Sequence, residues 1–162
     1  MAPSFQQLSD AERKWIDANL RVAESFIATY SAPDSAAPLS PAVLDRAFAA
    51  WLETGESDVQ QINALINAVG IAFGSLLVQE AGFSWVVASD EHGTEMAVLA
   101  LPGTGDVLVY PANFIAKRWE RKEGTFMEAC FADMVRRTRE LSESQPPAGK
   151  TPSVWKRLFK GV

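Results

Sequence analysis

The longest apolar segment of the chain lies between Val59 and Gln79 and contains no charged residue. Its apolar positions recur at spacings of three and four, which is the pattern of an α-helix. Ser57 and Gln60 have the spacing of a capping box at the start of this helix, and Gly82 is expected to end it. The pattern predicts the central helix of a domain, with an apolar stripe formed by Ile62, Leu65, Ile66, Val69, Phe73, Leu76 and Leu77.

This central segment is apolar enough to be compared with a membrane-spanning helix. Its candidate span, residues 62–78, has 17 residues and includes Asn63, Asn67, Ser75 and two glycines. Spanning candidates have about 18 or more consecutive apolar residues. A helix buried inside a globular domain is therefore the favoured interpretation.

Two further helices are predicted before the central one. Ser9 followed by Glu12 is a capping box, and apolar positions then recur at helical spacing as far as Tyr30. Ser40 followed by a proline marks a second helix start, which Gly55 is expected to end. The buried stripe of the first helix is expected to be widened by Trp15, Val22 and Phe26.

Strand-like segments follow the central helix. Residues 83–89, 95–101 and 106–110 are rich in apolar and β-branched side chains, and short turn sequences with glycine separate them. Parallel neighbours need a crossover of a dozen or more residues, so these short connections predict an antiparallel meander of three strands. Residues 112–120 then predict a short helix, and Thr125 with Glu128 predicts a capped helix that continues to Leu141.

Together these segments predict an α+β fold. N-terminal helices and the central helix pack on the three-stranded antiparallel meander, and C-terminal helices follow. Residues 1–141 are expected to form a single domain, because the chain has the length of one domain. Residues 142–153 are polar and contain prolines, so they are interpreted as a flexible linker. Residues 154–162 form a basic amphipathic tail.

Charge is distributed unevenly along the chain. The net charge is −5, and residues 150–162 carry four basic side chains and no acidic one, so the remainder carries −9. An acidic body argues against nucleic acid as a partner, since nucleic-acid binding requires a basic surface. Residues 1–10 lack the basic and apolar regions of a secretory signal, and Cys130 is the single cysteine. A cytoplasmic location is the resulting expectation.

An ordered set of short motifs runs through the middle of the chain. The motifs are LINAVGIAFG at 65–74, GFSWVV at 82–87, DEHGTE at 90–95, VYP at 109–111 and KRW at 117–119. With these motifs the chain resembles a bacterial family, domain of unknown function 3806, over about residues 60–125. Ser75 stands where that family often has an acidic residue. The resemblance implies an α+β fold and no particular activity.

Several residues on the central helix and the first strand are candidates for partner binding. Asn67, Gly70 and Gly74 share one helix face, which is either the floor of a groove or a place where a neighbouring element approaches closely. A buried Asn67 amide could equally form hydrogen bonds with the backbone of a strand or loop within the domain. Trp85 has strand spacing with Phe83, so it is either a core residue or a platform for stacking.

Charged residues offer further candidates. Asp90, Glu91 and Glu95 surround the only histidine, His92, which suggests either a divalent-cation site or ordinary turn chemistry. Two basic clusters are either solvated helix faces or surfaces for an acidic partner. They comprise Lys117, Arg118, Arg121 and Lys122, and then Arg136, Arg137 and Arg139. Cys130 is expected to be buried and unreactive among apolar neighbours.

The C-terminal tail combines apolar and basic side chains. On a helix, Val154, Trp155, Leu158 and Phe159 share one face, and Lys156, Arg157 and Lys160 lie between them. Such a segment can make weak contact with an anionic membrane through residues 154–160, dock in a partner's groove, fold back on the domain, or stay disordered.

The chain contains no catalytic motif and no metal-ligand spacing, so no cofactor is expected. The leading hypothesis is a non-enzymatic intracellular bacterial protein-interaction module. One alternative is a peripheral membrane adaptor that uses the tail. Another is a small-ligand or metal-dependent enzyme centred on the turn from Asp90 to His92. The proposed partner-binding residues are Asn67, Gly70, Gly74, Trp85, Asp90, Lys117, Arg118, Trp155, Lys156, Arg157, Leu158 and Phe159.

Overall fold

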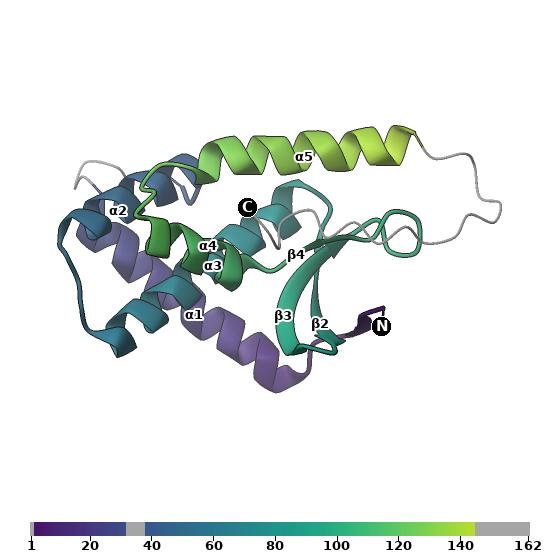
Figure 1. Ribbon diagram of the computed structural model, residues 1–162, viewed down its shortest axis with the longest axis horizontal. Coiled ribbons are helices and arrows are strands. Elements are labelled where there is room, and N and C mark those ends of the chain that lie inside the picture. Colours follow the sequence, from purple (N-terminus) through teal and green to yellow (C-terminus); the bar gives the residue numbers. More distant parts are fainter. Residues whose placement is uncertain (1, 32–37, 145–162) are drawn as a thin grey trace.

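The computed structural model describes residues 2–31 and 38–144. In this part of the chain, helices and strands follow in an order that matches an α+β fold (Figure 1). They are β1 (Ser4–Gln6), α1 (Asp10–Tyr30), α2 (Pro41–Glu53), α3 (Val59–Glu80), β2 (Ser84–Asp90), β3 (Gly93–Ala100), β4 (Val107–Val109), α4 (Pro111–Arg121) and α5 (Met127–Glu143).

The strands form one antiparallel sheet in the order β1-β2-β3-β4. The predicted meander is confirmed as β2, β3 and β4, with Trp85 opposite Val98 and Leu99 opposite Leu108. The sequence did not predict β1, which pairs with β2 and places Phe5 opposite Ala88. With only three residues, β1 is too short to show the alternation that identifies a strand.

The core lies between the sheet and the helices, with α3 at its centre (Figure 1). Twelve residues of α3 between Leu65 and Leu77 are buried, including six of the seven predicted stripe positions, and Ile62 is half-buried. Among the described helices, α3 is the one long and apolar enough to cross a membrane, and 67% of its most apolar stretch is buried. A core helix of a globular protein has the same properties. Trp51 on α2 stacks on Trp119 of α4 with ring centroids 3.9 Å apart, which ties these helices to the same core.

The structure confirms two of the predicted helix starts. Ser9 and Glu12 form a complete capping box on α1, and the Ser40 side chain accepts from the Val43 N–H at the start of α2. The predicted box of Ser57 and Gln60 is wrong. Asp58 caps α3 instead, because its carboxylate accepts from the Gln61 N–H at 3.0 Å.

The predicted box of Thr125 and Glu128 at the start of α5 is also wrong. Phe126 occupies the cap position and makes no side-chain cap hydrogen bond. The start of α5 is capped from α2, where the buried Asp45 carboxylate accepts from three consecutive backbone N–H groups, those of Phe126, Met127 and Glu128. These donors have no partner within their own helix, so the carboxylate satisfies them and neutralises the positive end of the helix dipole.

The C-terminal part of the chain differs from the prediction at the end of α5. Helix α5 continues to Glu143, two residues beyond the predicted end at Leu141. The remainder of the predicted linker and the whole of the tail at 154–162 lie outside the described residues. The tail candidates Trp155, Lys156, Arg157, Leu158 and Phe159 are therefore predictions from sequence.

Candidate functional site

The two glycines of α3 mark close contacts between the central helix and its neighbours. A Cβ atom added at Gly70 would lie 2.8 Å from the Ala112 Cα. A Cβ atom added at Gly74 would lie 2.5 Å from the Trp85 ring and 2.9 Å from the Pro111 Cγ. Both glycines are buried, so they admit the start of α4 and the indole of Trp85 and do not form an open groove floor.

A cleft of about 320 Å³ lies beside these contacts, between α1, α3, the sheet and the start of α4. It brings together two residues that the sequence singled out, Asn67 and Trp85. It also recruits residues that the sequence reasoning did not assign to a binding site, namely Trp15, Tyr110 and Asn113. Trp15 was predicted to widen the buried stripe of α1, but 41% of it is exposed, and Val22 is 42% exposed. In the sequence, the position of the Trp15 ring at the edge of the apolar stripe of α1 was the one feature that could have indicated a binding residue.

Two polar groups close one side of the cleft. The Glu95 carboxylate on β3 accepts a hydrogen bond of 2.7 Å from the Asn113 amide on α4. Burial, and in second place the negative charge of Glu95, raise the pKa of the Tyr110 phenol, so Tyr110 remains protonated at neutral pH. Among the described residues that line this cleft, Glu95 is the single charged one.

The cleft also lies along an edge of the sheet. The short strand β4 pairs with β3 only at Val98, Leu99 and Ala100. In the described part of the chain, no strand pairs with residues 93–97 of β3 on that side. Glu95 and Met96, which line the cleft, belong to this segment. Unpaired strand edges can hydrogen-bond an added strand.

The acidic turn between β2 and β3 has the geometry of a turn stabilised by an aspartate. The Asp90 carboxylate accepts from the His92 N–H at 2.7 Å, and His92 Nε2 lies 3.4 Å from a Glu91 carboxylate oxygen. The His92 and Glu91 side chains are 65% and 59% exposed. Across residues 2–31 and 38–144, no group of three His, Cys, Asp or Glu side chains is placed to hold a metal ion.

Comparison with known proteins places this arrangement in a family. The model of the family described as "Domain of unknown function (DUF3806)" matches residues 46–130, which is more than half of the chain. The chain belongs to the DUF3806 family. No curated protein and no solved structure matches the chain.

The DUF3806 match is wider than the expected range of about 60–125. It begins within α2, one residue after Asp45, and extends to Cys130 in α5. It therefore includes most of the cleft, with Asn67, Trp85 and Asn113, but it excludes Trp15 on α1.

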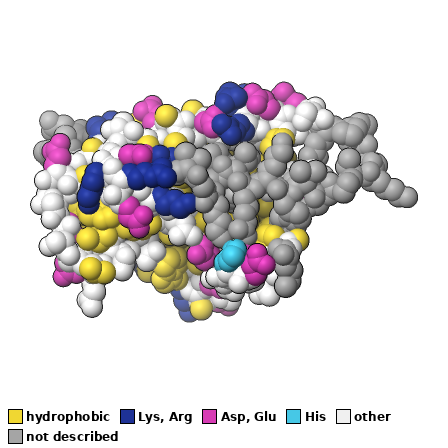
Figure 2. Space-filling model, in the orientation of Figure 1, with side chains coloured by type: hydrophobic (Ala, Val, Ile, Leu, Met, Phe, Trp, Pro, Cys, Tyr) yellow, Lys and Arg dark blue, Asp and Glu magenta, His cyan; other side chains and the backbone are white. Residues whose placement is uncertain are grey.

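The first basic cluster of the DUF3806 region lies on α4, and it is partly internal. The Arg118 side chain is only 12% exposed and pairs with Glu123. Its guanidinium group lies over the rings of Phe114 and Phe126, at 5.2 and 5.4 Å from their centroids. Arg118 therefore joins α4 to the segment before α5, and Lys117 beside it is half-buried. Lys and Arg side chains gather on one face of the molecule with acidic ones among them (Figure 2).

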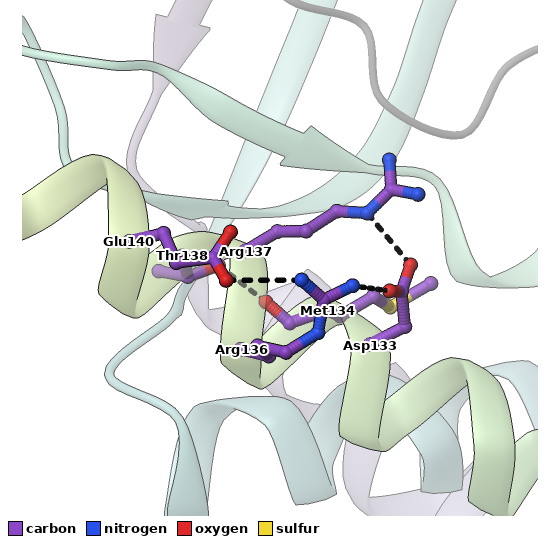
Figure 3. A network of polar contacts seen from close by, with 6 residues as sticks. All are labelled: Asp133, Met134, Arg136, Arg137, Thr138 and Glu140. Atoms are coloured by element: carbon purple, nitrogen blue, oxygen red, sulfur yellow. Dashed lines mark hydrogen bonds and ion pairs between the residues drawn. The ribbon is translucent and has the colours of Figure 1, made fainter.

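The second basic cluster lies on α5, beyond the DUF3806 match, and two of its three arginines pair with acidic residues of the same helix (Figure 3). Arg136 pairs with Asp133 and with Glu140, and Arg137 pairs with Asp133 at 2.8 Å. This is the arrangement of a solvated helix face, because the pairs are exposed and local.

Cys130 is half-buried beside the core, so its expected full burial is not observed. Burial is the main reason that the pKa of its thiol is raised. The positive charge of Arg118 lowers this pKa, whereas the negative charges of Asp133, Asp45 and Glu123 raise it further. A thiol with a raised pKa carries little thiolate at neutral pH and is a poor nucleophile.

Proposed function

We propose that this protein is a non-enzymatic interaction module that binds an extended segment of a partner protein in the cleft between α1, α3, β3 and α4. The observation that carries the proposal is the position of the cleft along residues 93–97 of β3, which pair with β2 but have no described strand on their other side. An added strand gains main-chain hydrogen bonds at such an edge, and its alternate side chains enter a neighbouring pocket.

The chemistry of the cleft supports a peptide as its occupant. Trp15 and Trp85 offer aromatic surface, and Trp15 is one of the few large apolar side chains exposed in the described residues. The Asn67 amide lines the cleft and makes no hydrogen bond within the described part of the chain. Aromatic anchors beside a few polar groups are typical of protein recognition sites.

The two alternatives have less support. An enzyme centred on Asp90 and His92 would require His92 to face a nucleophile or a metal, whereas its described side-chain contact is with Glu91 on an exposed turn. The membrane adaptor depends on residues 154–160, and salt-sensitive binding to anionic vesicles is its direct test.

The experiment is affinity capture from the native cells with matched cleft and control variants. Trp15→Ser and Asn67→Ala remove an aromatic surface and an amide from the cleft. Val22→Ser and Asn63→Ala make the same kinds of change at exposed positions of the same helices outside it. We expect a partner that the wild type and both controls retain and that both cleft variants bind at least about tenfold more weakly. Equal binding by all four variants would reject the cleft as the site.

A further inference from the structure

The sheet has a second apolar face, which points away from the main core. Strand register places Val86 opposite Ala97 and Leu99 opposite Leu108, and side chains that face each other across strands lie on the same side of the sheet. These residues belong to a second cluster, separate from the core around α3. Its members are Ala88, Ala97, Leu99, Leu108 and Tyr110, with Phe5 and Val86 packed against it.

No described helix contributes to this outer face. Within residues 2–31 and 38–144, the members of the cluster come from the strands and from Tyr110 directly after β4. The helices instead join the core on the opposite face, where Val98 and Val109 point. An antiparallel sheet with one solvated face normally alternates apolar and polar side chains. A continuous apolar face therefore indicates a surface that another segment covers.

Acidic residues border this face at one end. Glu95 is the cross-strand neighbour of Ala88 and shares its side of the sheet. Asp90 ends β2, and Glu91 lies in the turn that joins the same two strands. With Glu95 and Asp90, this end of the sheet forms a small hollow of about 120 Å³ that also includes Ala88 and Tyr110. A segment that matches the surface must be apolar on one side and carry positive charge.

The chain itself contains a segment of this kind. Residues 154–160 include Trp155, Leu158 and Phe159 together with three basic side chains and no acidic one. The described chain ends beside the sheet, because Ser142 and Glu143 line a cleft with Ala100 and Leu101 at the end of β3. The nine residues 145–153 span up to about 30 Å when extended. Four strands are about 15 Å wide, and the eight residues of β3 are about 25 Å long, so a linker of about 30 Å is long enough to reach across the outer face to its acidic end.

We propose that residues 154–160 dock on the outer face of the sheet of their own chain. Leu158 and the rings of Trp155 and Phe159 cover the apolar cluster, and Lys156, Arg157 and Lys160 lie toward Asp90, Glu91 and Glu95. Docking within one chain avoids the loss of translational freedom that association of two molecules requires, so a short segment suffices. The occupied surface is separate from the cleft proposed for the partner, apart from Glu95 and Tyr110, which border both hollows.

The test is nuclear Overhauser spectroscopy of the full chain with labelled methyl groups. We expect contacts from the ring protons of Trp155 or Phe159 to the methyl groups of Leu99 and Leu108, and none to Val98 or Val109 on the opposite face. The absence of all such contacts would overturn the proposal. Contacts that appear only between differently labelled molecules in a mixed sample would assign the surface to a second copy and would overturn it as well.

Variants in the tail provide an independent readout, because the substituted residues lie outside the described helices and strands. The full chain with Leu158→Glu and Phe159→Glu is expected to shift the methyl signals of Val86, Leu99 and Leu108 while those of Val98 and Val109 stay in place. Ser153→Ala is the matched control and is expected to shift neither set. The proposal would be overturned if the methyl signals of the outer face were the same in the double variant and the wild type, and the wild type bound phosphatidylserine vesicles through its tail. That result would assign the segment to a membrane.

Discussion

Asp45 accepts a hydrogen bond of 2.7 Å from the backbone N–H of Met127, 82 residues later in the chain. The same carboxylate accepts from the N–H groups of Phe126 and Glu128 at 2.9 Å. Asp45 is 4% exposed, so its charge is buried and its hydrogen bonds are made largely with these backbone groups. A side chain of α2 therefore fixes where α5 begins and holds the two helices together.

Removing this carboxylate should destabilise the protein more than removing any exposed acid. Asp45→Ala leaves three N–H groups without their acceptor, and we expect the free energy of unfolding to fall by about 2–3 kcal/mol. Asp45→Asn keeps one acceptor oxygen and should cost about half as much. Urea unfolding followed by circular dichroism gives both values.

Asp17→Asn is the matched control, because Asp17 is an exposed acid in the middle of α1. It should leave the midpoint of unfolding unchanged. An Asp45→Ala midpoint equal to that of the control would show that the cap contributes nothing to stability.

The glycines of α3 provide a second prediction. Gly→Ala normally stabilises an exposed helix by about 1 kcal/mol, because alanine has the higher helix propensity. Here the new methyl group at Gly70 would meet the backbone of Ala112, and the one at Gly74 would meet the Trp85 ring. We expect both substitutions to lower the free energy of unfolding by about 1–3 kcal/mol, measured by urea unfolding.

The two glycines should differ in how they can be rescued. The obstacle at Gly74 includes a side chain, so Trp85→Leu should recover part of the loss caused by Gly74→Ala. The same change should not rescue Gly70→Ala, since the obstacle there is the backbone of α4. Additive effects in the first pair would argue against the Gly74–Trp85 contact as the cause.

The features that the sequence predicted correctly are local ones. Capping at Ser9 and Ser40, the apolar stripe of α3 and the turns of the meander each depend on residues close together in the chain. The α+β class followed from these elements. The cap of α5 was not predictable in this way, because its acceptor, Asp45, lies on another helix. Thr125 and Glu128 have the spacing of a local capping box, but they do not form one.

The candidate site was predictable only in part. Asn67 and Trp85 were selected, and the structure places both in one cleft. Trp15 and Asn113 were not assigned to it, because they come from α1 and α4 and only the folded chain brings them to α3. Arg118 looked like a surface cation in sequence, but its pairing with Glu123 and its contacts with two aromatic rings make it largely internal.

Tyr110 predicts how stability depends on alkaline pH. Because its pKa is raised in the folded state, by burial first and by Glu95 second, the folded protein holds the phenolic proton more tightly than the unfolded chain does. The resulting stabilisation is complete below the unfolded pKa of about 10 and is lost as pH rises through the folded pKa. Tyr110→Phe should therefore have a flatter decline of the free energy of unfolding above about pH 10.

The role of Glu95 in this effect is open to direct measurement. Tyr30 is the only other tyrosine, so a Tyr30→Phe background reports Tyr110 alone in a near-ultraviolet absorbance titration. Glu95→Gln should lower the pKa of Tyr110 toward its ordinary value, and Glu91→Gln, on the neighbouring exposed turn, should change it less. An unchanged titration in Glu95→Gln would leave burial as the whole cause.

Cys130 predicts a slow reaction with thiol reagents. Burial raises the pKa of its thiol, and the negative charge of Asp133 adds to the shift, so less thiolate is present at neutral pH than in an unfolded chain. The pH profile of iodoacetamide alkylation should have a higher midpoint for the native protein than for the protein in urea. Asp133→Asn should move the native midpoint downward, whereas Asp17→Asn should not. A native midpoint at or below that of the unfolded chain would show that the Arg118 charge outweighs burial at this thiol.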